Sequence, residues 1–513
     1  MNLVYKPVKI PPSAAGKKLS DYLAGVGAMV QADCGGKGTC GKCKVKVLSG
    51  YFHKDSGLSE QLLPDEDGYI LSCKAFCPAI ETEVYVPFSQ GSGLTDFRKI
   101  TEDRDAIVAV PFDADYYACA LDIGTTTLAC ALVHVSGGET NVVSSGSRHN
   151  PQKNFGADVL SRISSASSGN LTLMQKLILD ASAQMIAELT NSFSDTFCLK
   201  KLVVTGNTTM LHLFCGVSPE KIGTYPFVPE FTDIKSFKGS DLNLPAEEVI
   251  LMPSISAFIG SDILSGILHT DILGENEPTA LIDIGTNGEM ILFTGKNNGN
   301  KLYAASAAAG PALEGAGISS GVGGISGAVC SVNFIGKMPV CKTIDSKPAL
   351  GICGSGLLDL IAGLLRLGVI DDTGYMDCGE FVYAHTENGN HLTITQQDIR
   401  AFQLAKSAIR AGFEALCDEA GIALCNLHKI YIAGGLGFHM NIDSAMATGL
   451  LDPALRGKFV NIGNSALGGA VRFSGSTDAR EKVNSITNLC KTIDLTRSEK
   501  FNNGFVEYMG FET

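Results

Sequence analysis

The sequence predicts a multidomain protein in which a small α+β domain precedes a larger α/β region built from a duplicated unit. Three observations lead to this prediction. The chain has 513 residues, which is more than one hydrophobic core usually organises. Four cysteines gather in a glycine-rich part of the first 75 residues. A strand–turn–strand pattern that begins near residue 118 returns about 160 residues later.

The composition is typical of a globular protein without a nucleic-acid partner. Hydrophobic residues make up 45% of the chain and are accompanied by 58 glycines, which favours a packed α/β protein over disorder. The net charge of −13 argues against nucleic-acid binding, because phosphate neutralisation needs a basic surface. We find no apolar run of membrane-spanning length and no signal peptide, so we expect no membrane partner and a cytoplasmic location.

Apolar periodicity outlines the first domain, which we expect over residues 1–87. Strands are predicted over residues 3–10, 43–48 and 80–86, and helices over residues 18–29 and 60–63. A turn at residues 64–68 then leads into residues 69–75, which carry the last cysteine of the cluster. Sixteen cysteines occur in all, and the twelve outside this cluster have no disulfide spacing, so we expect free thiols.

The four clustered cysteines, Cys34, Cys40, Cys43 and Cys73, have the spacing C-x5-C-x2-C-x29-C. Three close thiols followed by a distant fourth are typical of a plant-type ferredoxin, so we predict that these residues hold a [2Fe–2S] cluster. The intervening glycines permit positive φ angles and let backbone amides bend toward the cluster. The element order resembles the ferredoxin β-grasp domain, although the first interval has five residues where the plant type has four.

Two alternatives to this ligand set remain open. Four thiolates can also hold structural zinc, but zinc ribbons usually bring paired C-x2-C knuckles, and only Cys40 and Cys43 have that form. Cys77 lies four residues after Cys73 and is therefore an alternative fourth ligand.

A predicted linker over residues 88–116 separates the first domain from the duplicated unit, because it mixes glycine, serine and charged residues without periodicity. Residues 118–129 then read as a buried strand, Asp122, a Gly-Thr-Thr turn and a second strand. Residues 279–292 repeat this pattern with Asp283 and a Gly-Thr-Asn turn. Two such turns that face each other would clamp a triphosphate from both sides.

The chemistry of the turns predicts a site for Mg²⁺ and ATP. Backbone amides and hydroxyl groups can bind phosphate oxygens, and Asp122 and Asp283 can hold the Mg²⁺ ion through water. The predicted phosphate-binding residues are Gly124, Thr125, Thr126, Thr127, Gly285, Thr286 and Asn287. Glu289 is a candidate for orienting the attacking water, with a structural role as the alternative.

Further glycine-rich turns complete the predicted nucleotide site. Residues 429–437 form a strand that runs into Gly434 and Gly435, where adenosine could lie against bare backbone. Glycine turns at residues 308–317 and 351–357 precede predicted helices. The second turn contains Gly354 and Ser355, which are candidates for phosphate contact at a helix N-terminus, with close helix packing as the alternative.

The two turns and the Ala-Gly-Gly-x-Gly segment together resemble the superfamily of acetate kinase, sugar kinases, heat-shock chaperones and actin. This resemblance implies two duplicated subdomains with a ribonuclease-H-like fold that close on ATP, which we expect over residues 117–276 and 277–513. A Walker A lysine motif, which would indicate a different nucleotide fold, does not occur in the chain.

The whole chain resembles the ATP-dependent reductive activators of corrinoid proteins. The resemblance rests on the cysteine loop, on residues 121–127 and 283–289, and on residues 351–356. It implies an iron–sulfur ATPase that reduces cob(II)amide to cob(I)amide in a corrinoid protein of a methyl-transfer or O-demethylase system. It also implies an upstream low-potential electron donor and often a homodimer. Only Cys490 follows residue 469, so we do not expect the methanogen type with two [4Fe–4S] clusters.

Coupling to ATP makes physical sense for such a reaction. Each 59 mV that separates donor and acceptor in the unfavourable direction costs a factor of ten in a one-electron equilibrium. Nucleotide binding and domain closure can change the donor–acceptor complex so that transfer proceeds. Two alternatives are a small-molecule kinase with a redox-sensing ferredoxin domain and a nucleotide-gated electron-transfer scaffold without significant hydrolysis.

Overall fold

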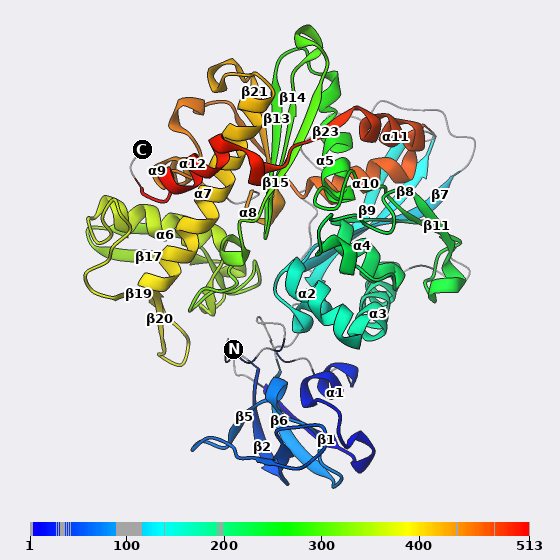
Figure 1. Ribbon diagram of the computed structural model, residues 1–513, viewed down its shortest axis with the longest axis vertical. Helices are drawn as coiled ribbons and strands as arrows, with labels where there is room; N and C mark the ends of the chain where they lie inside the picture. The colour runs from blue at the N-terminus through cyan, green and yellow to red at the C-terminus, as the bar shows by residue number, and fades with distance from the viewer. Residues whose placement is uncertain are drawn as a thin grey trace.

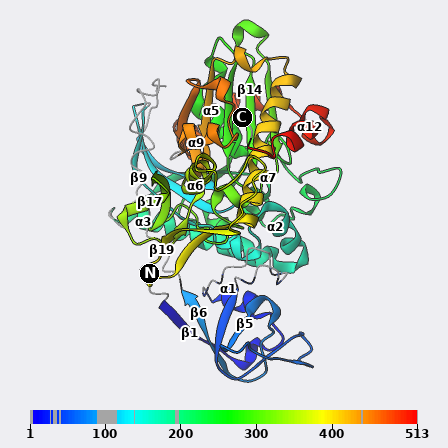
Figure 2. The same cartoon turned by 90° about the vertical axis from the view of Figure 1, so that its left-hand side faces the viewer.

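The computed structural model describes residues 4–511 apart from positions 27, 29, 31–35, 37, 39–40, 42, 89–114, 138, 192, 194–197, 438–439 and 477. The chain forms a small N-terminal domain and two lobes, each built on a six-stranded sheet (Figure 1). The N-terminal domain lies at one end of the molecule in both views (Figures 1 and 2). Cys34, Cys40 and most of the predicted linker over residues 88–116 fall outside the described residues.

The N-terminal domain has the predicted β-grasp form. Its four-stranded sheet has the order β1 (Val4–Ile10), β6 (Thr82–Phe88), β2 (Lys44–Ser49) and β5 (Tyr69–Leu71). Helix α1 (Leu19–Gly25) contributes Leu19 and Leu23, which are fully buried, to the core beneath this sheet. The helix is shorter than predicted and ends at Gly25, a residue type that disfavours helix.

The predicted helix over residues 60–63 is wrong. Gln61–Leu62 forms strand β4, which pairs antiparallel with β3 (Phe52–His53). The register places Leu62 opposite Phe52, whose side chain is buried in the domain core. This cross-strand apolar contact outweighs the helical preference of so short a segment.

The first lobe contains the first of the two predicted hairpins. Its sheet has the order β11 (Lys235–Lys238), β12 (Glu248–Leu251), β10 (Leu199–Gly206), β7 (Tyr116–Ile123), β8 (Thr127–Ser136) and β9 (Glu139–His149). Strands β7, β8 and β9 form an antiparallel meander, while β10 and β12 continue the sheet parallel to β7. Helices α2 (Val159–Ser165), α3 (Leu171–Thr190) and α4 (Thr208–Cys215) complete this lobe.

The second lobe repeats this arrangement and confirms the duplication. Its sheet has the order β22 (Phe459–Gly463), β21 (Lys429–Ala433), β13 (Thr279–Ile284), β14 (Gly288–Phe293), β15 (Leu302–Ala307) and β23 (Cys490–Thr492). Strands β13 to β15 are antiparallel, and β21 and β22 run parallel to β13. Every residue of β14 is buried, because packed elements cover both faces of the sheet.

Further elements surround the second sheet. Helix α7 (Gln396–Glu419) packs against β14 and β15, and α12 (Glu499–Glu507) packs against α7. This part of the chain also contains three further helices, α6 (Gly354–Arg366), α9 (Ile442–Ala447) and α11 (Ala479–Leu489). A smaller sheet consists of β17 (Met338–Thr343), β16 (Ala328–Ile335) and β18 (Gly351–Ile352), and a hairpin consists of β19 (Glu380–His385) and β20 (His391–Thr395). Among the described residues, no helix is both long enough and apolar enough to cross a membrane.

Two helices fill the space between the lobes. Helices α5 (Ser261–Thr270) and α10 (Ser465–Gly475) pack against each other, and one apolar core contains residues of both helices and of both sheets (Figure 1). Although α10 lies within the sequence of the second lobe, it contacts β7, β8 and β10 of the first. The hydroxyl group of Tyr116 donates a hydrogen bond to the Ser474 carbonyl at 2.7 Å across this contact. The first lobe is therefore completed by residues from near the end of the chain.

Candidate functional site

The two predicted turns, which follow β7 and β13, meet at a single carboxylate. The hydroxyl groups of Thr126 and Thr286 both donate hydrogen bonds to Oε2 of Glu314, at 2.5 and 2.6 Å. Glu314 ends a short 3₁₀ helix over Pro311–Glu314 that follows β15. The structure thus brings together the turns that the sequence predicts to face each other, and it adds a residue that the sequence interpretation had not singled out.

Backbone and side-chain contacts fix the shape of the first turn. The Gly124 amide donates to the Thr127 carbonyl at 3.0 Å, and a Cβ atom at Gly124 would lie only 2.7 Å from that oxygen. Only glycine therefore fits this position without a shift of the backbone. Asn150 donates from Nδ2 to the Gly124 carbonyl at 2.8 Å, and Asn207 donates to the Thr125 hydroxyl oxygen at 3.2 Å.

A buried arginine supports the same turn from behind. The Arg162 side chain is fully buried, and its guanidinium group donates to the carbonyl groups of Thr125 and Gly156. Burial lowers the pKa of Arg162 to about 9, and the nearby carboxylates of Glu314 and Asp158 act in the opposite direction. This arrangement satisfies carbonyl groups that would otherwise be buried without a partner, which costs free energy.

Replacement of Arg162 by methionine is expected to lower the midpoint of thermal unfolding of the lobes by about 5 °C or more. The change removes the donors to Thr125 and Gly156 but keeps apolar volume. Differential scanning calorimetry measures the effect. The control is Arg148→Met, which removes a partly exposed ion pair with Glu188 and should change the midpoint little. Equal shifts in the two variants would contradict a special role for Arg162.

Four carboxyl groups gather where the strands of the two hairpins end: Asp122, Asp262, Asp283 and Glu289. Burial raises the pKa of Asp122 to about 7, that of Asp262 to about 6 and that of Asp283 to about 8. Repulsion between the groups adds to the effect on Asp122 and Asp283. These carboxyl groups repel one another when they are ionised without a cation. A hard divalent cation, which prefers oxygen ligands, would offset that repulsion. The described residues contain no group of three or more acidic, histidine or cysteine side chains placed to ligate a metal directly, so this oxygen chemistry fits a Mg²⁺ ion that is held through water.

Asn464 connects this carboxylate group to helix α10. Its Nδ2 donates to Oδ2 of Asp122 at 2.8 Å, while its Oδ1 accepts from the Leu467 amide at 2.7 Å and caps the helix. The sequence interpretation missed this site contact. The Asn-Ser pair that opens the helix is a recognisable N-cap signal, but the signal does not reveal the distant partner.

Glu289 is paired in register with Asp283 on the neighbouring strand. Its side chain is 8% exposed, and burial together with repulsion from Asp262 and Asp283 raises its pKa well above the ordinary value. A group that orients water by accepting a proton must be ionised, whereas this environment favours the neutral form. Without a cation, this environment favours the neutral form of Glu289, and both the role with water and the structural role stay predictions.

The glycine-rich segments lie in different surroundings. At Gly434, where φ is +91°, a Cβ atom would lie 2.6 Å from Oδ1 of Asp283, so glycine is needed for helix α8 (Gly434–Gly437) to approach β13. A Cβ atom at Gly435 would meet nothing within 4 Å, which leaves room beside its backbone. At Gly354, a Cβ atom would lie 1.8 Å from the Leu313 carbonyl, and the neighbouring Ser355 hydroxyl donates to the Cys330 carbonyl. These contacts favour the packing alternative for Gly354 and Ser355.

The N-terminal domain brings two of the predicted cluster ligands together. The sulfur atoms of Cys43 and Cys73 are 3.2 Å apart, and both side chains are buried. Gly36, Gly38 and Gly41 have positive φ angles of 80°, 75° and 68°, which is the loop conformation that glycine permits. Converging thiols beside such a loop fit an iron–sulfur cluster.

Cys77, the alternative ligand, has different neighbours. Its side chain is fully buried, and burial raises the pKa of its thiol to about 11. The charged groups that act on it are Lys17 and Asp21, at helix α1. A raised thiol pKa disfavours the thiolate that metal ligation requires. The structure thus favours Cys73 as the fourth ligand.

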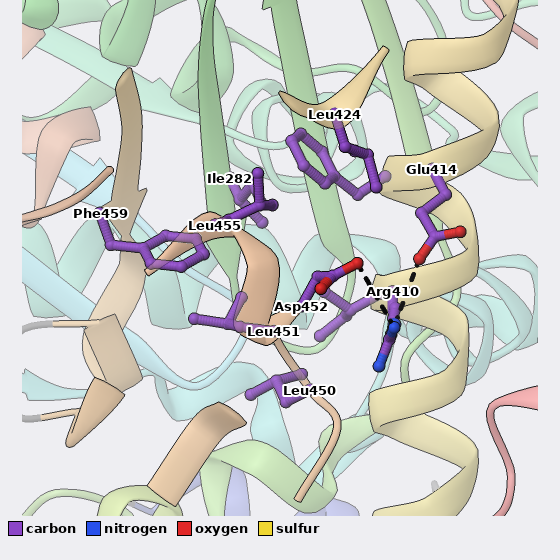
Figure 3. A pocket seen from close by; sticks show the side chains of 11 residues that line it. Ile282, Arg410, Glu414, Leu424, Leu450, Leu451, Asp452, Leu455 and Phe459 are labelled. Carbon is purple, nitrogen blue, oxygen red and sulfur yellow. Dashed lines mark hydrogen bonds and ion pairs between the residues drawn. The ribbon is translucent and has the colours of Figure 1, made fainter. Parts of the chain in front are cut away.

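A separate hollow in the second lobe lies between α7 and the sheet (Figure 3). Arg410 bridges two acidic side chains there: its Nε lies 3.2 Å from Oε1 of Glu414, and its Nη2 lies 3.5 Å from Oδ2 of Asp452. Most of the other lining residues are apolar, and the hollow has room for about one water molecule. Neither predicted turn contributes to its lining, so this hollow is a feature of the core rather than the nucleotide site.

The fold and the site define a class of protein in which a ferredoxin-like domain is joined to a duplicated, actin-like ATPase fold. Three family descriptions match the chain: "2Fe-2S iron-sulfur cluster binding domain" over residues 6–77, "RACo middle region" over residues 117–275 and "C-terminal domain of RACo the ASKHA domain" over residues 277–513. The chain belongs to the family of corrinoid activation enzymes, as the following relatives show.

The corrinoid activation enzyme RamQ of Eubacterium limosum is 30% identical, and the match covers 94% of each chain. The [Co(II) methylated amine-specific corrinoid protein] reductase of Methanosarcina barkeri is 28% identical over 77% of each chain. Among solved structures, a reductive activator for a corrinoid, iron-sulfur protein superposes with a TM-score of 0.71 at 27% identity. That match covers 98% of this chain and 96% of the solved one.

Proposed function

We propose that the protein uses ATP to reduce the cobalt of a corrinoid protein by one electron, from cob(II)amide to cob(I)amide. One observation carries this proposal: a single chain holds paired thiols in a ferredoxin fold and two phosphate-type turns that meet at one carboxylate. The relatives are named for activation or reduction of corrinoid proteins, which supports this class of partner.

We assign the four ligands of a [2Fe–2S] cluster to Cys34, Cys40, Cys43 and Cys73 in a domain over residues 1–87. When bound, such a cluster supplies one electron at low potential. Cys43 and Cys73 are already adjacent and buried, so these thiols need little rearrangement to bind metal. A low-potential electron donor must reload the protein after each transfer, and we propose a reducing, cytoplasmic setting and a homodimer.

We assign nucleotide binding to the two lobes, over residues 117–276 and 277–513. Asp122 and Asp283 would hold Mg²⁺, and the two turns would bind the phosphates of ATP. The open backbone at Gly435 supports a place for adenosine there. Water then attacks the terminal phosphorus and gives ADP and inorganic phosphate, while one electron passes separately to cobalt. Closure of the lobes would link these two events.

The critical measurement compares cobalt reduction with and without Mg-ATP. The reduced protein is mixed with a cob(II)amide-containing corrinoid protein from a methyltransferase system, and cob(I)amide is followed by its absorbance. We expect reduction to be at least tenfold faster with Mg-ATP and to be accompanied by ADP formation. Equal rates without nucleotide would refute the coupling. Phosphorylation of a metabolite would indicate the kinase alternative, and nucleotide stimulation without ADP would indicate the scaffold alternative.

A further inference from the structure

We propose that Glu314 competes with the phosphates of the nucleotide for the hydroxyl protons of Thr126 and Thr286. The inference rests on the proposed binding of ATP at the two turns and assigns a positioning role to a residue outside them. Its starting point is that both hydroxyl groups donate to the same carboxylate oxygen, Oε2, at 2.5 and 2.6 Å.

Each threonine hydroxyl group can donate its hydrogen bond either to Glu314 or to a phosphate. A threonine hydroxyl has one proton to donate, although its oxygen can accept further hydrogen bonds. A phosphate oxygen is an acceptor, like the carboxylate, so Thr126 and Thr286 cannot donate to both at once. For either hydroxyl to bind phosphate as a donor, its hydrogen bond to Glu314 must break.

The backbone that carries Glu314 is fixed, so the change must occur in the side chain. The preceding Leu313 is buried, and the following Gly315 has a positive φ of 76°. A Cβ atom at Gly315 would lie 2.0 Å from the Val322 carbonyl, which shows how closely this segment is packed. Oε1 of Glu314 lies 3.1 Å from the position of a Cβ atom at Gly285, so the carboxylate covers the second turn.

Electrostatic repulsion also supports competition between Glu314 and the phosphates. The charge of Glu314 raises the pKa of Asp283, and the buried Arg162 guanidinium is the nearby cation that opposes this charge. Phosphates bring more negative charge to the same place, so the carboxylate opposes nucleotide binding. Because Thr126 and Thr286 belong to different lobes, release of Glu314 also removes a link between the lobes. Nucleotide binding is thereby coupled to their relative position.

The test is a titration of the full-length protein with a non-hydrolysable ATP analogue and Mg²⁺ in a calorimeter. Glu314→Ala is expected to bind the analogue about tenfold more tightly than the wild type, which is the range of one hydrogen bond to a charged group. Glu314→Gln retains a neutral, weaker acceptor and should fall between the two. It is also the informative variant if the alanine protein fails to fold.

Removal of the two threonine hydroxyl groups tests whether the gain in nucleotide affinity comes from the release of their hydrogen bonds to Glu314. In a protein that carries Thr126→Val and Thr286→Val, the further change Glu314→Ala should produce less than half of its usual gain in affinity. Glu380→Gln removes a charge at an exposed position of the same lobe and should leave affinity unchanged. Unchanged or weaker binding by both Glu314 variants would overturn the inference, as would an equal gain without the hydroxyls or from Glu380→Gln. Absence of binding by the wild type would instead overturn the proposed ATP site.

Discussion

Replacement of Cys73 by serine is expected to abolish the visible absorption of the [2Fe–2S] cluster and, with it, cobalt reduction. The Cys73 sulfur lies 3.2 Å from that of Cys43, and these two are the members of the predicted four-cysteine set that the described residues contain. Serine keeps the size of the side chain but replaces the soft thiolate that iron prefers. The absorption spectrum and the iron content of the purified protein measure the outcome.

Cys77→Ser is the matched control for this variant. The residue lies in the same domain and is equally buried, but its charged neighbours are Lys17 and Asp21 at helix α1. The variant should therefore keep the cluster spectrum and most of the activity. Loss of the cluster in Cys77→Ser together with its retention in Cys73→Ser would show that the assignment of the fourth ligand is reversed.

Replacement of Asp283 by asparagine is expected to reduce ATP hydrolysis by about a hundredfold or more, because the change removes a charged oxygen ligand from the proposed Mg²⁺ site. The cluster spectrum should remain, since the change lies in a different domain. Measurement of phosphate release over a range of Mg²⁺ concentrations checks the result. Glu380→Gln, an exposed charge removal in the same lobe, is the control. Wild-type hydrolysis by Asp283→Asn would exclude this carboxylate from the site.

The same variant should be more stable than the wild type in metal-free buffer. Burial and repulsion raise the pKa of Asp283 from 3.8 to about 8, so the folded state retains a proton that the unfolded state releases. The free energy of unfolding of the wild type therefore falls as the pH rises from about 4 to about 8. Asparagine does not titrate, so its advantage in the free energy of unfolding should grow over this window and then level off. Thermal unfolding at several pH values in a chelator measures the difference.

The sequence predicts the parts of this protein that local patterns encode. The cysteine spacing indicates a ferredoxin domain, and the repeated Asp-x-Gly-Thr turns at Asp122 and Asp283 indicate a duplicated nucleotide fold. Both fold predictions are confirmed by the paired six-stranded sheets and by the family matches. Each of these signals lies within a short stretch of chain, so its residue types and their spacing are enough to recognise it.

The residues that connect these parts could not be predicted in the same way. Glu314 comes from a glycine-rich turn whose place against both hairpins depends on the packing of the second lobe. Asn464 reaches Asp122 from 342 positions away. Arg162 has the sequence appearance of a surface residue on a helix, yet it is fully buried beneath the first turn. Such contacts are set by tertiary structure, which periodicity and spacing do not encode.

The position of helix α10 has a consequence for how the chain is made. One face of the first sheet packs against α10 as well as α5, so that face lacks part of its cover until residue 475 has left the ribosome. At about 5–20 residues per second, the interval after the end of α5 lasts roughly 10–40 seconds. During this time the nascent chain exposes β7, β8 and β10, which are rich in buried apolar residues. Chaperones that recognise apolar strands are expected to bind at this stage of synthesis, and a chain that stops before α10 is expected to aggregate.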